Sequence, residues 1–317
     1  MTDSTSGYSA AAAKAANCWF DVDRVARNAA STAWKRSARL RQAQWRAARD
    51  LPIGSEPYGG GPESTPVGSR LELAFARESG VNFISAGALA AARARVAAPE
   101  RHEMLHEERL WADLLSSMPL CFNLFGEVAA DADAARRAVG AWWPDAPIGD
   151  VTVRFEHSPG RRDPTFLGNK SAFDVAFDIE VGAGERAIVG VETKYHEHAK
   201  SEESPKPKAL ARYTEVTERS GIFVTGWRDL IVGTELQQIW LDHLLVLAML
   251  QHPSKLWSWG RFVLASPAAN PSFAGAAARY ANVLRDPRTF EARTLESLIA
   301  DASLGVDGAR GFRDRYL

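Results

Sequence analysis

The spacing of apolar residues changes about halfway along this chain of 317 residues. Up to residue 150 the apolar positions recur mostly at helical spacing, with alanine-rich runs free of glycine and proline. Helices are predicted over 9–50, about 86–97, 103–125 with a break near Pro119, and 129–142. Residues 51–69 are dense in proline, glycine and serine, which predicts an irregular connector and a domain boundary there.

From residue 151 the period becomes two, as in a β-strand with two different faces. Strands are predicted over 151–157, 172–181, 187–195, 221–226 and 260–270. A strong helix is predicted over 234–251, where Thr234 and Gln237 have the spacing of a capping box, and helical turns are expected at the end of the chain. Helices followed by a run of strands, then a helix and a strand, favour an α/β layer arrangement over a bundle or a sandwich.

The strands 172–181 and 187–195 carry charged residues in their middle. The Gly-Ala-Gly at 182–184 suits a short hairpin loop with glycine in the left-handed conformation, which sets Asp174 opposite Glu192. Lys194 lies two residues further on the same face, and a loop shifted by one residue at both ends would instead oppose Asp174 to Lys194. Either register brings the three groups together. Gly190 on that face is expected to leave room for a ligand.

The other face of the first strand is predicted to be apolar, formed by Phe173, Val175, Phe177 and Ile179. Two opposed carboxylates repel each other unless a cation lies between them, and hard oxygen ligands on rigid strands suit Mg²⁺. Lys194 could orient or help deprotonate a water, or neutralise charge on a phosphate. A solvated cluster of salt bridges is the alternative for the same three residues.

Composition adds little to this picture and excludes some classes of function. The formal net charge is −1, so no global basic field indicates nucleic acid, although nine Lys or Arg against three Asp or Glu between residues 12 and 50 give that segment a local net charge of +6. The two cysteines, Cys18 and Cys121, are far apart and favour a reduced, cytoplasmic setting. The start of the chain does not look like a secretory signal, and the longest apolar run, 244–250, is too short to span a bilayer, so no membrane partner is expected.

Two further segments contain residue types that occur in functional sites. His196 and His198 form an H-x-H pattern that suits zinc, but no third ligand has a recognisable spacing, so a pair at the edge of a loop is favoured. Residues 200–212 predict a polar loop that could either fold onto a substrate through its lysines or remain solvated.

The arrangement of Asp174 and Glu192-x-Lys194 on adjacent strands resembles the PD-(D/E)XK nuclease superfamily, although Phe173 stands where the motif has proline. Longer phrases resemble a branch of uncharacterised bacterial restriction endonucleases. They are LLSSMPLCFNLFG at 114–126, FEHSPGRRD at 155–163, AFDVAF at 172–177, VETKYHE at 191–197, QIWLDHLLVLAML at 238–250 and VLASPAAN at 263–270. Together they span about two thirds of the chain.

This resemblance implies a restriction-endonuclease-like core, with a central mixed sheet flanked by helices, that cuts phosphodiesters of DNA with Mg²⁺ or, as a substitute, Mn²⁺. Carried over by position, Asp174 and Glu192 become metal ligands, joined by the backbone carbonyl of Thr193, and Lys194 becomes the catalytic lysine. The resemblance also suggests catalytic roles for three further residues, Glu156, Glu197 and Gln238.

The expected organisation is a helical N-terminal accessory region over 1–98, with the connector near 51–69, and a nuclease-like domain over 99–317. The expected partner is a nucleic acid, DNA in the first instance, and cutting of both strands would suit a homodimer. Two alternatives stay open at this point. One is a protein of the same fold that binds nucleic acid through the basic helix at 24–49 without cleaving it, and the other is an RNA-directed nuclease or toxin.

Overall fold

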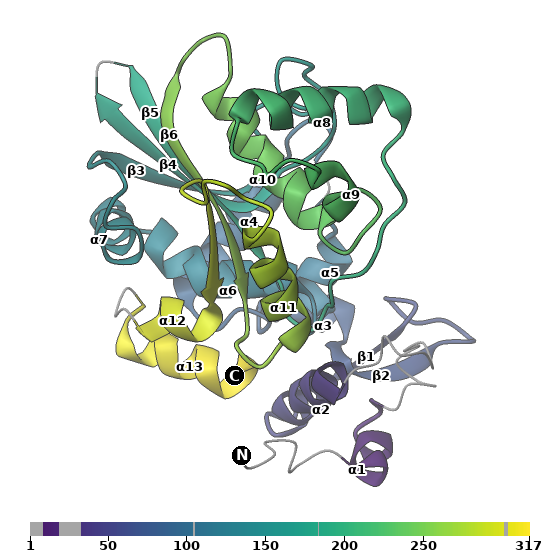
Figure 1. Ribbon diagram of the computed structural model, residues 1–317. Coiled ribbons are helices and arrows are strands. Elements are labelled where there is room, and N and C mark those ends of the chain that lie inside the picture. The colour runs from purple at the N-terminus through teal and green to yellow at the C-terminus, as the bar shows by residue number, and fades with distance from the viewer. Residues whose placement is uncertain (1–8, 19–32, 104, 183, 301–303) are drawn as a thin grey trace.

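The computed structural model describes residues 9–18, 33–103, 105–182, 184–300 and 304–317 (Figure 1). Its centre is a five-stranded sheet in the order β3-β4-β5-β6-β7. The strands are β3 (Asp150–His157), β4 (Phe173–Gly182), β5 (Glu185–Thr193), β6 (Trp257–Ser266) and β7 (Phe290–Thr294). The first three are antiparallel, whereas β5, β6 and β7 are parallel, so the predicted α/β fold with a mixed sheet is confirmed.

Helices cover both faces of this sheet and enclose two separate apolar cores. One core is shared with α4 (Ala86–Ala97), α5 (Glu107–Ala112), α6 (Ser117–Ala129), α7 (Ala132–Trp142), α12 (Leu295–Ala300) and α13 (Val306–Tyr316). The other is shared with α8 (Pro207–Ser220), α9 (Trp227–Ile231), α10 (Gln237–Leu250) and α11 (Pro271–Ala281). Figure 1 shows α8, α9 and α10 gathered on one side of the sheet. No helix in the described part of the chain is long and apolar enough to cross a membrane.

The alternation along β4 separates these cores, with one exception at its start. Val175, Phe177 and Ile179 belong to the core around α6, and Ala176 belongs to the core around α10, as a period of two requires. Phe173 was predicted to share the face of Val175, but its ring lies in the core around α10. The regular alternation therefore breaks at Asp174, the first residue of interest in the strand.

The helix α6 begins before Pro119, where the sequence predicts a break. The interruption between α5 and α6 instead falls at residues 113–116, and Pro119 lies in the first turn of α6. A proline is tolerated there because the first N–H groups of a helix have no partner within the helix. Ser116 caps α6 by accepting a hydrogen bond from the N–H of Met118 at 3.2 Å.

The N-terminal part contains more strand than the sequence predicts. It comprises α1 (Ala10–Ala15), α2 (Ala33–Ala47), β1 (Ile53–Glu56), β2 (Thr65–Leu71) and α3 (Leu73–Ser79). The predicted irregular connector at 51–69 is wrong, because β1 and β2 pair as an antiparallel hairpin, and only the long turn at 57–64 is irregular. The helix predicted over 9–50 is found in part, as α1 and α2, and residues 19–32 lie outside the described residues.

Three predictions later in the chain need correction, and one strand was missed. Residues 221–226 form a turn after α8 with only an isolated bridge from Phe223 to Leu284, and β7 was not predicted. The segment 200–212 is a loop only up to residue 206, because Pro207 starts α8, where its fixed φ suits the first turn. The helix predicted from residue 234 begins at Gln237, whose side chain accepts a hydrogen bond from the N–H of Gly233 (2.8 Å) and not from that of Thr234.

Candidate active site

Three carboxylates lie side by side across β3, β4 and β5. Val175 pairs with Phe155 on one neighbouring strand and with Val191 on the other. One residue further along each strand, the same register sets Asp174 between Glu156 and Glu192. The structure therefore places Asp174 opposite Glu192, the first of the two registers that the sequence allows.

This register survives an irregularity at the hairpin turn. Counting back from a three-residue loop would pair Val181 with Glu185, but Gly182 pairs with Glu185, and the ladder shifts by one residue between Glu180 and Gly182. From Glu180, which pairs with Arg186, the predicted register is restored. The bulge near the turn thus absorbs the extra residue and leaves the position of Asp174 unchanged.

Asp174 is fixed by the residue that follows Glu192. Its Oδ2 accepts hydrogen bonds from the backbone N–H of Thr193 at 2.7 Å and from Thr193 Oγ1 at 2.6 Å. Among the described residues none bonds to its other oxygen, Oδ1. Asp174 is thereby held in one orientation with one oxygen left to accept a ligand.

Gly190 has a structural explanation that differs from the predicted one. A Cβ built on Gly190 would lie 2.4 Å from the ring of Phe173, which packs over this position. The glycine makes room for Phe173 and not for a ligand, so that expectation is wrong. The same packing accounts for the turned side chain of Phe173 at the start of β4.

Lys194 brings a buried cation to the row of carboxylates. Its Nζ forms an ion pair with Glu192 Oε1 at 2.7 Å, and the side chain is 9% exposed. Burial lowers the pKa of the Lys194 amine, but the carboxylates of Glu192 and Asp242, with others nearby, outweigh burial and hold that pKa above its usual range. Lys194 is therefore charged at neutral pH and can act as a donor.

The carboxylates of Asp174 and Glu156 are both destabilised in their charged form. Burial, together with the negative charges of Glu192 and Glu156, raises the pKa of Asp174 well above its ordinary value. Burial and the charge of Glu192 raise the pKa of Glu156 to about 7. One lysine does not compensate three acids, and the site is suited to a further positive charge.

Glu156 is placed by an unusual backbone conformation. It has φ of 51°, in the left-handed region that residues other than glycine seldom adopt. Its carbonyl accepts a hydrogen bond from Arg161 Nη2 at 2.8 Å, which ties the following loop to this point of β3. Strain of this kind is concentrated at functional sites, where the surrounding structure maintains it.

The donor set fits a hard cation that keeps part of its water. In the described part of the chain no group of three His, Cys, Asp or Glu side chains is arranged to hold a metal ion. Two carboxylates, Asp174 with a free oxygen and Glu192 with one oxygen beyond its ion pair, are available on adjacent strands. Mg²⁺ is commonly bound by one or two carboxylates, with water and substrate phosphate as the other ligands.

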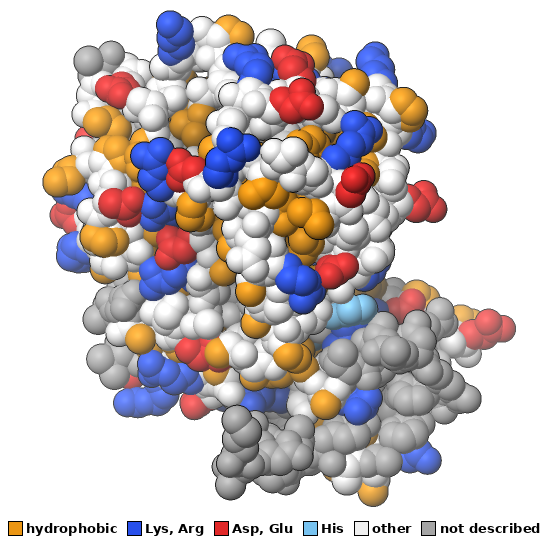
Figure 2. Space-filling model, viewed as in Figure 1, with side chains coloured by type: hydrophobic (Ala, Val, Ile, Leu, Met, Phe, Trp, Pro, Cys, Tyr) orange, Lys and Arg blue, Asp and Glu red, His pale blue; other side chains and the backbone are white. Residues whose placement is uncertain are grey.

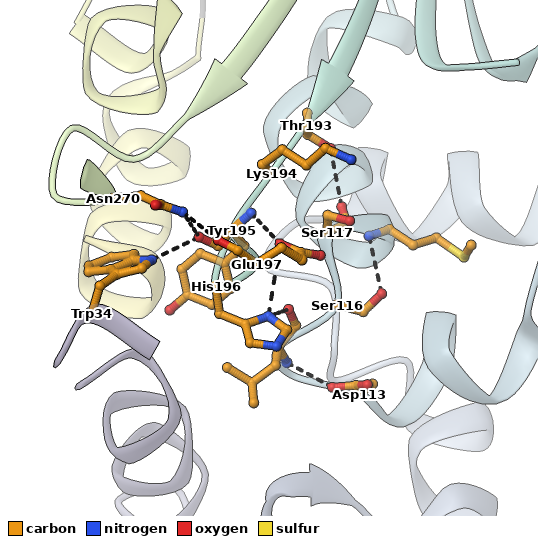
Figure 3. A network of polar contacts seen from close by, with 12 residues as sticks. Trp34, Asp113, Ser116, Ser117, Thr193, Lys194, Tyr195, His196, Glu197 and Asn270 are labelled. Carbon is orange, nitrogen blue, oxygen red and sulfur yellow. Dashed lines mark hydrogen bonds and ion pairs between the residues drawn. The ribbon is translucent and has the colours of Figure 1, made fainter. Parts of the chain in front are cut away.

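The segment after Lys194 is clamped from three sides (Figure 3). Trp34 Nε1 and Asn270 Nδ2 both donate to the carbonyl of Tyr195, each at 3.0 Å. The carboxylate of Glu197 accepts from the N–H of Tyr195 at 2.7 Å and lies 3.9 Å from His196 Nδ1. Glu197 thus holds the turn that follows β5, beside the three carboxylates and not within their row.

His196 takes part in this clamp. Its Nδ1 lies 2.9 Å from the carbonyl of Leu115, in the segment that leads into α6. Burial raises the pKa of Glu197, but the positive charges of His196 and Lys194 outweigh this and leave that pKa lowered. These contacts hold His196 in the loop that follows β5.

The helix α10 brings two polar side chains toward the sheet. Gln238 and Asp242 are one turn apart on α10, so they lie on the same side of the helix, and both are half-buried. Burial and the charge of Glu192 raise the pKa of Asp242 well above its ordinary value, with Lys194 acting in the opposite direction. Asp242 was not predicted, although its spacing from Gln238 in a helix packed on this sheet was a usable signal.

The comparisons with known proteins agree with this geometry. A family model described as the PD-(D/E)XK nuclease superfamily matches residues 29–317. The chain belongs to the PD-(D/E)XK nuclease superfamily. No curated protein and no solved structure matches it. Membership implies nuclease chemistry, and divalent metals are typical of the superfamily.

Proposed function

We propose that this PD-(D/E)XK chain is a metal-dependent endonuclease that hydrolyses phosphodiester bonds of DNA, in bacterial defence or DNA processing. The observation that supports it best is the row of Glu156, Asp174 and Glu192 at one register of the sheet. The ion pair of Lys194 with Glu192, at 2.7 Å, adds a buried donor to that row. Opposed carboxylates destabilise the fold, and a bound metal ion would offset their repulsion and hold a substrate phosphate.

In this proposal Asp174 and Glu192 hold Mg²⁺ or Mn²⁺, with the carbonyl of Thr193 as a further ligand. When bound, the metal supplies positive charge for the phosphate oxygens and favours ionisation of a water. Thr193 keeps Asp174 oriented through its N–H and hydroxyl. The other side chains bind, orient and accept protons around that centre.

Lys194 would donate to a phosphate oxygen or orient the attacking water, because its raised pKa keeps the amine charged. Glu156, with a pKa of about 7, could accept a proton from that water near neutral pH. Gln238 would contact substrate or water from α10, and Glu197 would act by holding the turn after Lys194. The pairing of two such sites in a homodimer, a cytoplasmic location and an accessory role for residues 1–98 complete the proposal.

A cleavage assay tests this function. Plasmid, linear and single-stranded DNA and RNA are incubated with Mg²⁺, Mn²⁺ or EDTA and the wild type, Asp174→Ala or Lys194→Ala. Glu180→Gln serves as the matched control, since Glu180 is an exposed acid further along β4. We expect DNA cutting that needs metal, is lost in both site variants and survives in the control.

Other outcomes assign the alternatives. Cutting of RNA alone would indicate an RNA-directed nuclease. Retention of DNA without cutting under any condition would indicate a protein that binds nucleic acid and does not cleave it.

In the described part of the basic helix at 24–49, Arg46 donates to the carbonyls of Gly68 (3.0 Å) and Leu51 (2.7 Å), so this arginine is engaged within the fold.

A further inference from the structure

A basic pocket opens beside the carboxylate row, lined by the segment after α4 and by the loop that follows β3. Its volume is about 520 Å³, and its lining is polar and charged, formed by Glu100, Arg101, His102, Ser158, Arg161 and Arg162. This size lies within the range of small-molecule and cofactor sites. The pocket adjoins the carboxylate row, because Arg161 in its lining donates a hydrogen bond from Nη2 to the backbone carbonyl of Glu156 at 2.8 Å.

The pocket carries positive charge that the described residues do not neutralise. Its acid, Glu100, accepts a hydrogen bond from Arg161 Nη1 at 2.5 Å, and nearby Glu103 pairs with Arg95. Arg101 and Arg162 form no ion pair with any described residue. Two guanidinium groups thus remain for an anion.

Two enclosed polar atoms on this pocket also lack a partner. Ser158 Oγ and Arg161 Nε are buried and form no hydrogen bond with any described residue. The side chain of Arg161 is 3% exposed, so its Nε cannot rely on bulk solvent. Buried donors are nearly always satisfied in native proteins, so two unsatisfied donors on residues that line this pocket indicate a missing polar partner.

The pKa of His102 reflects desolvation and the excess of positive charge around the pocket. Desolvation, followed by the positive charges of Arg162, Arg101 and Lys170, lowers the pKa of His102. His102 and Arg162 both have positive φ, 67° and 62°, which holds these two residues in the conformation that lines the pocket. The imidazole is thereby kept neutral beside the two arginines and can still donate one hydrogen bond.

We propose that this pocket binds a phosphate group of the nucleic acid and so positions the strand across the carboxylate row. The inference rests on the proposed function, because its ligand is the polymer that the neighbouring site would cut. Arg101 and Arg162 would neutralise the phosphate, and Ser158 Oγ with Arg161 Nε would donate to its oxygens. On the face shown in Figure 2, basic and acidic side chains are interspersed, so attraction for a polyanion would come from a local cluster of positive charge and not from a broad basic surface.

Binding measured in EDTA tests the pocket without cleavage. Fluorescence anisotropy is recorded over a salt series with short oligonucleotides that do or do not carry a terminal phosphate. The proteins are the wild type, Arg101→Gln, Arg162→Gln, the double variant and Arg162→Lys. Arg228→Gln is the control, since Arg228 is an exposed arginine on α9, in the helical layer on the other face of the sheet from α4. Melting temperatures of all variants confirm that the fold is retained.

We expect each glutamine variant to weaken binding by on the order of tenfold and to reduce the salt slope by about one. Arg162→Lys should retain most of the affinity because it keeps the charge. Loss with every oligonucleotide indicates a backbone phosphate, and loss only with the terminal phosphate indicates an end-binding pocket.

The inference is overturned if the double variant binds with the affinity and salt slope of Arg228→Gln, or if the wild type binds no oligonucleotide. Failure of the proposed function is distinguishable from this. A wild type that never cuts with metal, while the arginine variants still change the salt slope, would remove the nuclease and leave the phosphate pocket in place.

Discussion

Asp174 and Asp178 lie four residues apart on β4, between the same two neighbouring strands, and in opposite electrostatic surroundings. Asp178 accepts hydrogen bonds from Arg186 Nε at 2.8 Å and Nη2 at 2.6 Å, and from Arg154 Nε at 3.3 Å. Asp174 instead lies directly opposite Glu156 and Glu192 on those strands, whereas the arginines of Asp178 come from diagonal positions.

Asp178 shows how a structural acid is accommodated in this sheet. Arginines on β3 and β5 surround Asp178, and its charge is paired within the fold. At Asp174 the two flanking strands supply further acids, and the balancing lysine, Lys194, is engaged with Glu192. Opposed acids at one end of the hairpin, where the other end shows that pairing is available, support the ligand proposed for Asp174.

The largest expected difference is in the cleavage rate, between variants of Lys194 and of Arg186. Replacing Lys194 by methionine should lower metal-dependent cleavage by about 10²–10³-fold, the usual effect of losing one donor to a developing charge. Arg186→Met removes one of the two arginine partners of Asp178 and should leave the cleavage rate per folded molecule unchanged. Rates measured at saturating substrate, corrected for the folded fraction, compare the two. Equal loss in both variants would contradict the division into a catalytic and a structural end.

At Asp178, where the acid is paired with arginines, removing the charge should destabilise the fold. Asp178→Asn removes a charged acceptor from two arginines and should lower the free energy of unfolding by about 2–3 kcal/mol. Urea unfolding in EDTA measures this, with the exposed Glu180→Gln on the same strand as control. A variant as stable as the wild type would mean that the arginines of Asp178 contribute nothing.

The pH dependence should expose the strain at the opposed end. Glu156 has its pKa raised from 4.5 to about 7, so between these values the unfolded chain has lost the proton that the folded protein keeps. Folding then takes up a proton, and this carboxyl makes the metal-free protein less stable as pH rises from 4.5 toward 7, with no further change above. Glu156→Gln should flatten that part of the stability curve, measured as the urea midpoint against pH. An unchanged curve would show that Glu156 is not strained.

The smallest effect is expected outside both ends, in the clamp behind Lys194. Trp34→Phe keeps the ring and removes the hydrogen bond from Nε1 to the carbonyl of Tyr195, which should cost about 1 kcal/mol of stability. A drop in the cleavage rate larger than this loss explains would show that α2 positions Lys194. The melting temperature and the rate of one sample provide both values.

The sequence was sufficient for the hairpin and for the part of the site within it. Alternation and the glycine loop brought Asp174, Glu192 and Lys194 together, because neighbours in a hairpin are set by local geometry. The pairing of Glu156 with Asp174 depends on a loop from 158 to 172 between β3 and β4, whose length fixes no register. Glu156 therefore followed only from the family resemblance.

Other features depend on tertiary packing that local patterns do not encode. Asp242 reaches the site only because α10 packs on this sheet, and Gly190 is small because Phe173 turns over it. The hairpin of β1 and β2 was hidden by a composition that is also typical of loops. Of the residues proposed for catalysis, Asp174, Glu192 and Lys194 are specified by the hairpin, whereas Gln238 is placed by the packing of α10 on the sheet.

The most direct test of the account is the thermal stability of the wild type and Asp174→Asn with and without Mg²⁺ or Mn²⁺. Without metal, Asp174→Asn should be more stable at neutral pH, because one of the opposed charges is gone while Thr193 keeps an oxygen acceptor. With metal at about one hundred times its dissociation constant, the wild type should gain about 2.7 kcal/mol and the variant far less. Equal gains in both proteins, or none in the wild type, would contradict a metal centre at Asp174.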